Sequence, residues 1–247
     1  MPTLEFSRLT IIFMKNRINH IYLIALIALL PTILINCAKD ITPTASTCGM
    51  SITINHVAGS VAPDNKTVTY GTVTNIPGEP TKCWITQNLG ASKQAIAVDD
   101  ATEAAAGWYW QFNRKQGFKH DGTTLTPATT WISNSNENSN WIATNDPCTL
   151  ELGNGWRLPS RTEWSNVHAS GNWFTCNAPF SSGLKLHAGG YLDLSDGSLE
   201  NRGFNGLYWS STQHDESYGW TLDFACATSF ISWLYKANGY TTRCLKE

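Results

Sequence analysis

The distribution of tryptophan constrains the fold of this chain more than any other feature of its sequence. All eleven tryptophans lie between Trp84 and Trp233, where charged residues are sparse. A buried tryptophan removes about 150–250 Å² from water, so these residues are the first candidates for a core. Glycine and asparagine are frequent in the same region, and long stretches of helical periodicity are absent. This pattern predicts many short strands and loops rather than layers of helices.

The size and charge of the chain limit its class. From Cys37 to Glu247 there are 211 residues, enough to bury about 70 % of the surface that an unfolded chain exposes. The composition, 42 % apolar and 15 % charged, is that of a globular protein and not of a disordered one. Without residues 1–36 the chain has 14 basic and 18 acidic residues. Because a nucleic-acid surface needs a basic excess, a nucleic-acid partner is not expected.

The N-terminal region is predicted to be a lipoprotein signal. Residues 21–35 form an uncharged run of fifteen, preceded by Lys15 and Arg17. This length is short for a membrane span of about 20 residues and is typical of a signal-peptide core. The string LINC, ending at Cys37, resembles the lipobox of bacterial lipoproteins, in which the cysteine becomes residue one and carries lipid. The alternative is an ordinary secretory signal with a nearby cysteine.

This interpretation divides the chain into three parts. Residues 1–36 are the signal peptide, with Met14 as an alternative start, and residues 37–50 are a lipidated tether. Residues 51–247 form a single domain. Ala38 in place of aspartate favours the outer membrane, and Lys39–Asp40 faintly resembles the export tag of surface lipoproteins. We therefore expect a membrane partner through lipid on Cys37, with the domain facing the periplasm or the outside.

The other six cysteines suggest disulfides, because an even number in an exported chain usually forms pairs. They are Cys48, Cys83, Cys148, Cys176, Cys226 and Cys244. No two have the C-x-x-C spacing of zinc ribbons or thioredoxin-type sites. Six cysteines permit fifteen pairings, and the spacing alone does not choose among them.

Local patterns predict a capped helix, a shorter second helix and several strands. Ser160 and Glu163 form a capping box, so a helix is expected over 161–169. Acidic residues followed by Gly107 indicate a short helix over 99–106. Alternating β-branched residues over 51–76 predict a hairpin-like pair of strands. Further strands are expected at 83–89, 107–112, 208–212, 219–224 and 240–245.

An ordered series of motifs resembles a known family, the Fibrobacter succinogenes major paralogous domain of lipoproteins from Bacteroidetes and Fibrobacteres. The similarity covers about residues 64–247. Its motifs are YGTVTNI (70–76), CWITQNLG (83–90), GWYWQFNRKQGF (107–118), CTLELGNGWRLPSRTEW (148–164), GGYLD (189–193), GLYWSST (206–212) and GYTTRCLKE (239–247). The resemblance implies an α+β fold of the C-type-lectin-like kind, with short curled antiparallel sheets, one or two helices and long loops. No enzymatic activity is established for that family.

The resemblance also implies disulfide pairs. It places Cys148 and Cys244 at the base of the fold, where such domains are often closed, so these two are expected to pair. With that pair made, the remaining cysteines are assigned as Cys176–Cys226 and Cys48–Cys83.

Catalytic and metal-binding patterns are weak. The chain has no G-x-S-x-G motif, and the tripeptides of calcium-dependent lectins are absent. Asp193, Asp196 and Glu200 are interpreted as part of a turn-rich loop, and His214-Asp215-Glu216 as a solvated loop. An oxidase of the formylglycine-generating type would need a close reactive cysteine pair, and Cys226 and Cys244 are expected to form disulfides. We therefore expect no enzyme, no cofactor and no metal site.

A ligand platform is the remaining hypothesis. Trp131 and Trp141 flank a polar Asn/Ser loop and are candidates for exposed rings, whereas packing beneath that loop is the alternative. The loops 119–146 and 193–205, the second including Arg202, are the expected binding segments. The tryptophans in strand, helix or motif text are expected in the core: Trp84, Trp156, Trp164, Trp209 and Trp220.

The function predicted from the sequence is a non-enzymatic binding module for a glycan or an envelope protein. A structural or assembly role in the envelope is the second hypothesis, and a lectin-fold oxidase is the third.

Overall fold

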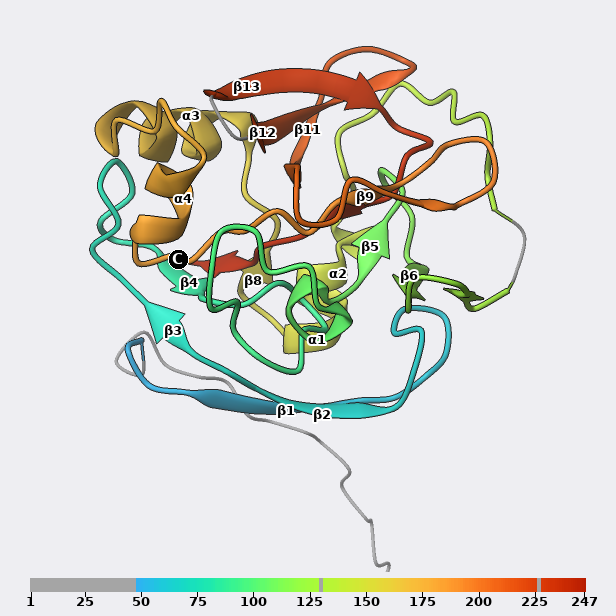
Figure 1. Cartoon of the computed structure of the whole chain (residues 1–247), viewed down its shortest axis with the longest axis horizontal. Coiled ribbons are helices and arrows are strands. Elements are labelled where there is room, and N and C mark those ends of the chain that lie inside the picture. Colours follow the sequence, from blue (N-terminus) through green and yellow to red (C-terminus); the bar gives the residue numbers. More distant parts are fainter. Residues whose placement is uncertain (1–47, 129–130, 226–227) are drawn as a thin grey trace, which may run out of the picture. The chain divides into compact units, whose positions relative to one another are not determined.

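A computed structural model describes residues 48–128, 131–225 and 228–247 (Figure 1). The predicted signal peptide, Cys37 and most of the tether lie outside the described residues. The helices are α1 (Glu103–Ala106), α2 (Pro147–Leu152), α3 (Arg161–Ser170) and α4 (Asn177–Ser181), with a 3-10 helix at Ala143–Asn145. The strands are β1 (Ile52–His56), β2 (Lys66–Tyr70), β3 (Thr72–Val73), β4 (Cys83–Ile85), β5 (Tyr109–Trp110), β6 (Gly117–His120), β7 (Leu125–Thr126), β8 (Trp156–Arg157), β9 (Tyr191–Leu192), β10 (Leu199–Glu200), β11 (Gly206–Gln213), β12 (Tyr218–Ala225), β13 (Thr228–Tyr235), β14 (Tyr240–Thr241) and β15 (Leu245–Lys246).

The strands of the described part form two larger sheets and two ribbons. One sheet has seven strands in the order β13-β12-β11-β14-β5-β6-β7, and the other has four in the order β3-β4-β15-β8. Pairing is antiparallel throughout except between β11 and β14. With four short helices in the described residues, this sheet-rich architecture is consistent with the predicted α+β class.

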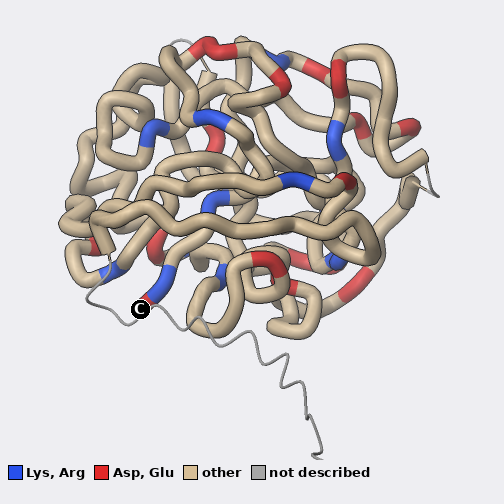
Figure 2. Tube along the Cα trace, turned by 90° about the horizontal axis from the view of Figure 1, so that it is seen from below, with Lys and Arg blue, Asp and Glu red and all other residues tan. Residues whose placement is uncertain are grey.

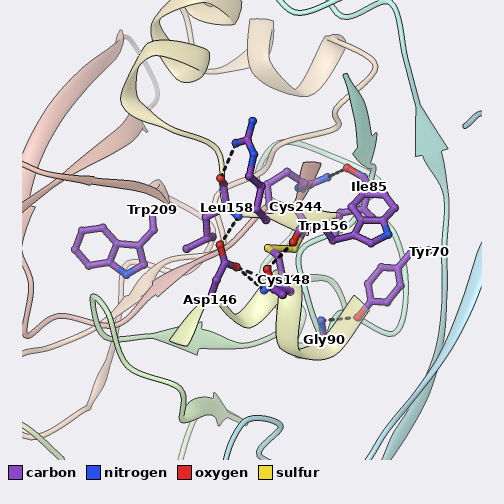
Figure 3. Close-up of a disulfide and its surroundings, with 12 residues drawn as sticks. Tyr70, Ile85, Gly90, Asp146, Cys148, Trp156, Leu158, Trp209 and Cys244 are labelled. Carbon is purple, nitrogen blue, oxygen red and sulfur yellow. Dashed lines mark hydrogen bonds between the residues drawn. A yellow bond between two sulfur atoms is a disulfide. The ribbon is translucent and has the colours of Figure 1, made fainter. Parts of the chain in front are cut away.

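The predicted N-terminal hairpin is present as the β1–β2 ribbon, with Ile52 paired to Tyr70 and His56 paired to Lys66. Alternation of exposed threonines with buried Val68 and Tyr70 turns one face of β2 toward the core. Tyr70 Oη accepts a hydrogen bond from Gly90 N (Figure 3). His56 links the ribbon to α2, because its ring nitrogens lie 2.5 Å from Glu151 Oε2 and 2.8 Å from Tyr70 Oη.

Helix α3 begins where the sequence predicted. Ser160 Oγ accepts from Glu163 N and Glu163 reaches back to Ser160 N, so the capping box is complete. The helix packs on β11, β12 and β13. Its Trp164 is fully buried, and the indole Nε1 donates to the Trp209 carbonyl at 3.0 Å. This contact joins α3 to β11 of the seven-stranded sheet.

Two of the three predicted disulfides are present, Cys48–Cys83 and Cys148–Cys244. Figure 3 shows the second beside Asp146, whose carboxylate accepts from Cys148 N and Leu158 N. In a loop-entropy model, closing 96 residues stabilises by about 4.7 kcal/mol and closing 35 by about 3.8. The assigned partner of Cys176 is Cys226, which lies outside the described residues, so that pair stays a prediction.

The C-terminal segment contains a fully buried arginine whose guanidinium binds carbonyl and amide oxygens. Arg243 donates to the carbonyls of Ile85 and Leu184 and to Asn88 Oδ1, at 2.7–3.3 Å. Burial lowers its pKa to about 10, so the guanidinium is still charged at neutral pH. Because these acceptors come from distant parts of the chain, one side chain connects three segments in the core.

Several predicted boundaries are wrong. Helix α1 has four residues instead of eight, because Asp100 holds the preceding turn through hydrogen bonds to Ile96 N and Thr102 N. The strand expected at 240–245 is divided into β14 and β15 by buried Arg243 and Cys244. The sequence patterns also missed α2, α4 and the whole of β13.

His187 should make the fold sensitive to acid. It is 1 % exposed, and its ring nitrogens have no partner within residues 48–128, 131–225 and 228–247. Burial together with nearby Arg243 lowers its pKa to about 3. An unfolded histidine binds a proton below about pH 6.5. Between about pH 6.5 and pH 3 the unfolded state therefore binds more protons than the folded state, and the free energy of unfolding decreases as the pH is lowered. This group alone should remove about 2 kcal/mol at pH 5 relative to pH 7.

Chemical denaturation of the parent and of His187→Met from pH 7 to pH 4 measures this effect. Below pH 6, the free energy of unfolding of the parent should decrease relative to that of His187→Met by about 1.4 kcal/mol for each pH unit that the pH is lowered. Parallel curves for the two proteins would contradict the assignment.

Candidate functional site

The two tryptophans proposed as a platform do not form one. Trp141 is 7 % exposed, its Nε1 donates to the Asn145 carbonyl, and its ring packs on Phe112 and Trp209 at 5.1 and 6.3 Å between centroids. Trp131 is partly buried and packs on the edge of Phe118. The alternative of packing beneath a long loop therefore describes both residues.

Hydrogen bonds hold the polar loop between these tryptophans against the turn that joins β11 to β12. Glu137 N donates to the Glu216 carbonyl, and Gln213 bonds to the side chains of Asn138 and Asn140. Lys236 is buried, and its ammonium donates to the Glu137 carbonyl at 2.6 Å. Burial lowers the pKa of Lys236. The negative charge of Glu137 is the largest effect that raises this pKa and so opposes burial. The loop is thus part of the scaffold.

The second expected binding loop, 193–205, is also occupied by internal bonds. Asp193 accepts from Ser195 and Asp196 accepts from Ser198 within tight turns. Arg202 donates to Tyr109 Oη and to the His120 carbonyl. Glu200 lies in the short strand β10. Throughout the described residues, no group of three His, Cys, Asp or Glu side chains is arranged to hold a metal ion.

The structure instead brings four aromatic side chains together on β12 and β13, here called the aromatic face: Tyr218, Trp220, Trp233 and Tyr235. Tyr218 is paired with Tyr235 and Trp220 with Trp233, and directly paired residues of antiparallel strands share one face of the sheet. Ring centroids lie 4.6 Å apart for Tyr218 and Tyr235 and 4.8 Å for Tyr218 and Trp233.

The aromatic face is exposed because α3 covers only part of this side of the sheet. Leu222, Phe224 and Ile231 belong to the core cluster that includes Trp164 of α3. The strands continue past the start of the helix, where the Arg161 guanidinium lies 3.8 Å from the Trp220 ring centroid. Trp233 is 47 % and Tyr235 is 48 % exposed. Trp220, predicted in the core, is therefore only partly buried at the edge of the helix.

His214 extends the aromatic face from the β11–β12 turn. Its ring stacks on Trp233 at 5.1 Å and 27° and meets Trp220 at 5.2 Å. The neighbouring Asp215 accepts from Ser217 N, Tyr218 N and His214. Desolvation raises the pKa of Asp215, but these hydrogen bonds outweigh it and hold the pKa below its usual range. Asp215 therefore carries a negative charge at neutral pH beside the rings.

Two hollows flank Ser217 next to this face. The first, here called the serine hollow, has a volume of about 340 Å³ and is lined by Ser133, Asn134, Ser135, Ser217 and Tyr235, with Leu194 and Ala237. The second, here called the acidic hollow, is about 510 Å³ and includes Asn138, His214, Asp215 and Glu216. Tyr235 belongs both to the aromatic face and to the serine hollow, so the two are continuous.

This arrangement is suited to binding. Aromatic rings offer apolar surface, and serine hydroxyls and an asparagine amide offer hydrogen bonds without charge. Over the rest of the described chain, basic and acidic residues are interspersed (Figure 2). The aromatic face has Arg161 at one edge and Asp215 beside it, so its rings and not an excess of one sign of charge distinguish it.

Comparisons with protein-family models, with curated proteins and with solved structures find no match to this chain. The family resemblance of the motifs therefore stays a prediction. Among the residues that the structure describes, no helix is both long enough and apolar enough to cross a membrane.

A signal for the aromatic face was present in the sequence. Tyr218 and Trp220, and Trp233 and Tyr235, are each spaced by two residues, which places both members of a pair on one face of a strand. The prediction placed a strand at 219–224 but none at 228–235, so the second pair was missed. The exposure of these rings depends on where α3 begins relative to the strands.

Trp141→Ala and Trp233→Ala should separate core from surface. Truncating buried Trp141 should lower the free energy of unfolding by about 3–5 kcal/mol, because it leaves a cavity beside Phe112 and Trp209. Truncating exposed Trp233 should change it by less than about 1 kcal/mol. Denaturant unfolding of both variants and the parent measures these losses, and equal losses would contradict the assignment.

Proposed function

We propose that this protein is an outer-membrane lipoprotein whose C-type-lectin-like domain binds a glycan on the aromatic face, without catalysing a reaction. The observation that carries the proposal is the group of four aromatic side chains, with His214, on an uncovered part of a rigid sheet. Contiguous exposed aromatic surface is uncommon on soluble domains and marks binding sites.

Sugar rings suit this surface for a physical reason. One face of a pyranose presents C–H groups, which pack on an aromatic ring, while its edge carries hydroxyls that need hydrogen-bonding partners. The aromatic face supplies rings, and the adjoining serine hollow supplies hydroxyl and amide groups. Serine hydroxyls and an asparagine amide both donate and accept hydrogen bonds, as sugar hydroxyls require, so the neutral lining of the serine hollow supports a glycan.

The lectin-like assignment has support from the connectivity. The last strand, β15, pairs with β4 from the start of the domain, and the Cys148–Cys244 bond joins α2 to the residue before β15. These contacts close the base of the domain, as the family resemblance implies. The polar loop that precedes Trp141 lies against the β11–β12 turn, at the end of these strands where the aromatic face is located.

The cysteines support both an exported location and a non-enzymatic role. Disulfides persist in oxidising compartments and are rare in the cytosol, and the domain has two among its described residues. Cys244, one of the two late cysteines considered for an oxidase, is fully buried and bonded to Cys148. An oxidase using Cys244 as an accessible thiol would first have to break this bond.

Glycan binding can be tested with the full chain purified from the membrane fraction in detergent. We expect it to bind oligosaccharides on an array of neutral and acidic glycans. Trp233→Ala should weaken that binding by at least about fivefold, the equivalent of 1 kcal/mol. Phe230→Ala is the matched control, because Phe230 is 45 % exposed on the same strand but on the opposite face.

Two outcomes would sink the proposal. If the parent binds no glycan, the aromatic face has another role. If envelope proteins then co-purify with the parent and are lost with Trp233→Ala, the assembly hypothesis takes its place. Equal losses of glycan binding with Trp233→Ala and Phe230→Ala would place the site elsewhere.

The lipid anchor is tested separately. Replacing Cys37 with serine should abolish labelling by radioactive palmitate and move the protein from the membrane fraction to the soluble fraction. Cys48→Ser is the control, since it removes a cysteine that pairs with Cys83 and should leave the labelling intact. Unchanged labelling of the Cys37→Ser variant would refute lipidation at this residue.

A further inference from the structure

We infer that the serine hollow is a subsite for one uncharged sugar ring, and that the protein therefore selects neutral oligosaccharides over their acidic counterparts. This inference rests on the proposed glycan function and adds the ligand class and a second set of contacts. The volume of the serine hollow, about 340 Å³, lies at the lower end of the range of about 300–1,000 Å³ typical of small-molecule sites. The hollow thus has room for a small ligand group.

The walls of the hollow are held in place by buried hydrogen bonds. Gln111 is 2 % exposed, and its Nε2 donates to the carbonyls of Ile132 and Ala237, both at 2.6 Å. Trp131 Nε1 donates to the carbonyl of Leu194 on the lining. Lys236 N donates to the carbonyl of Ser217. A preformed site loses less conformational entropy when a ligand binds.

Ser135 gives the hollow an unfulfilled hydrogen-bonding group. This residue is 5 % exposed, and its hydroxyl has no hydrogen-bond partner among the described residues. A buried hydroxyl without a partner destabilises a fold by about 1–3 kcal/mol, so its presence at the wall of a hollow needs an explanation. Ser135 lines the hollow, and a sugar hydroxyl bound there can both donate to and accept from a serine hydroxyl.

The charge distribution determines the class of sugar. None of the side chains that line the serine hollow is charged. On the other side of Ser217, the acidic hollow includes Asp215 and Glu216, and Asp215 is ionised at neutral pH. A uronic acid would therefore bring a carboxylate to a site without a cation in its lining and with acidic neighbours. Neutral sugars avoid this repulsion.

The continuity of the surface suggests how a chain of sugars lies on it. Tyr235 lines the hollow and packs on Tyr218, which in turn packs on Trp233. One ring in the hollow would leave the next ring over these aromatic side chains. Two neighbouring contacts of moderate strength on one oligosaccharide then act together.

The test uses calorimetry on the full chain in detergent at pH 7 with five hexasaccharides. Cellohexaose, mannohexaose and chitohexaose are the neutral probes, and the hexamers of β-1,4-glucuronan and β-1,4-mannuronan are the acidic counterparts of the first two. At least one neutral probe should bind. The acidic probes should bind at least tenfold more weakly than that neutral probe does. Binding of no neutral probe, or equal binding of the acidic probes, overturns the inference.

Variants in the hollow distinguish this inference from the proposed function. Ser133→Trp fills the hollow from its exposed wall and should raise the Kd for the best neutral probe at least tenfold. Asn136→Trp is the matched control, because Asn136 is exposed on the same loop but does not line the hollow. Ser135→Ala should raise the Kd about three- to tenfold, which corresponds to the free energy of one hydrogen bond. It should not lower the melting temperature.

The outcomes separate the two ideas. If Trp233→Ala weakens binding while Ser133→Trp and Ser135→Ala bind as the parent does, the hollow is no subsite and the glycan function stands. If Ser135→Ala melts lower and binds normally, Ser135 is structural and the inference fails. If Ser133→Trp weakens binding and Asn136→Trp does not, at unchanged melting temperatures, the inference is supported.

Discussion

The fold depends on the way its last strand segments join the two larger sheets. β14 lies between β11 and β5 of the seven-stranded sheet, and β15 lies between β4 and β8 of the four-stranded sheet. Between them stand Arg243 and Cys244, both fully buried. The guanidinium binds carbonyls from two other segments and the sulfur is bonded to α2. Burying a cation is costly unless hydrogen bonds compensate it, and the bonds of its two terminal nitrogens to Ile85, Leu184 and Asn88 tie these segments to Arg243.

This rigid base explains why the opposite end can carry exposed aromatic rings. Once β14 fixes β11, the hairpin strands β12 and β13 extend from it as a sheet that α3 covers from Arg161 onward. The side of the sheet beneath the helix is apolar core, and the same alternation continues beyond the helix as Trp220, Trp233 and Tyr235. The aromatic face is therefore apolar because it continues the same side of the sheet that packs against α3. The strands that carry it are fixed by their buried part.

Sequence patterns predicted the local features whose causes are themselves local. The capping box of Ser160 and Glu163 and the alternation in β1 and β2 need only neighbouring residues, and both were found. The pair Cys148–Cys244 was expected from the family resemblance and Cys48–Cys83 by elimination after it, and both bonds are present. The site was missed because exposure is not a local property. Trp141 follows a polar Asn/Ser run and is buried against Phe112 and Trp209. Trp233 stands beside Leu234 in a largely apolar strand and is exposed, because α3 does not cover it.

The polar loop beside Trp141 shows where composition misleads and what corrects it. Its Asn and Ser residues resemble a binding loop, yet Asn138, Asn140 and Glu137 are already bonded to the β11–β12 turn and to Lys236. Groups with partners inside the protein support the scaffold. Ser135, on the same loop, is buried beside a hollow and has no such partner. Because a buried polar group without a partner destabilises the fold, the unpaired hydroxyl and not the number of polar residues indicates where a ligand would add hydrogen bonds.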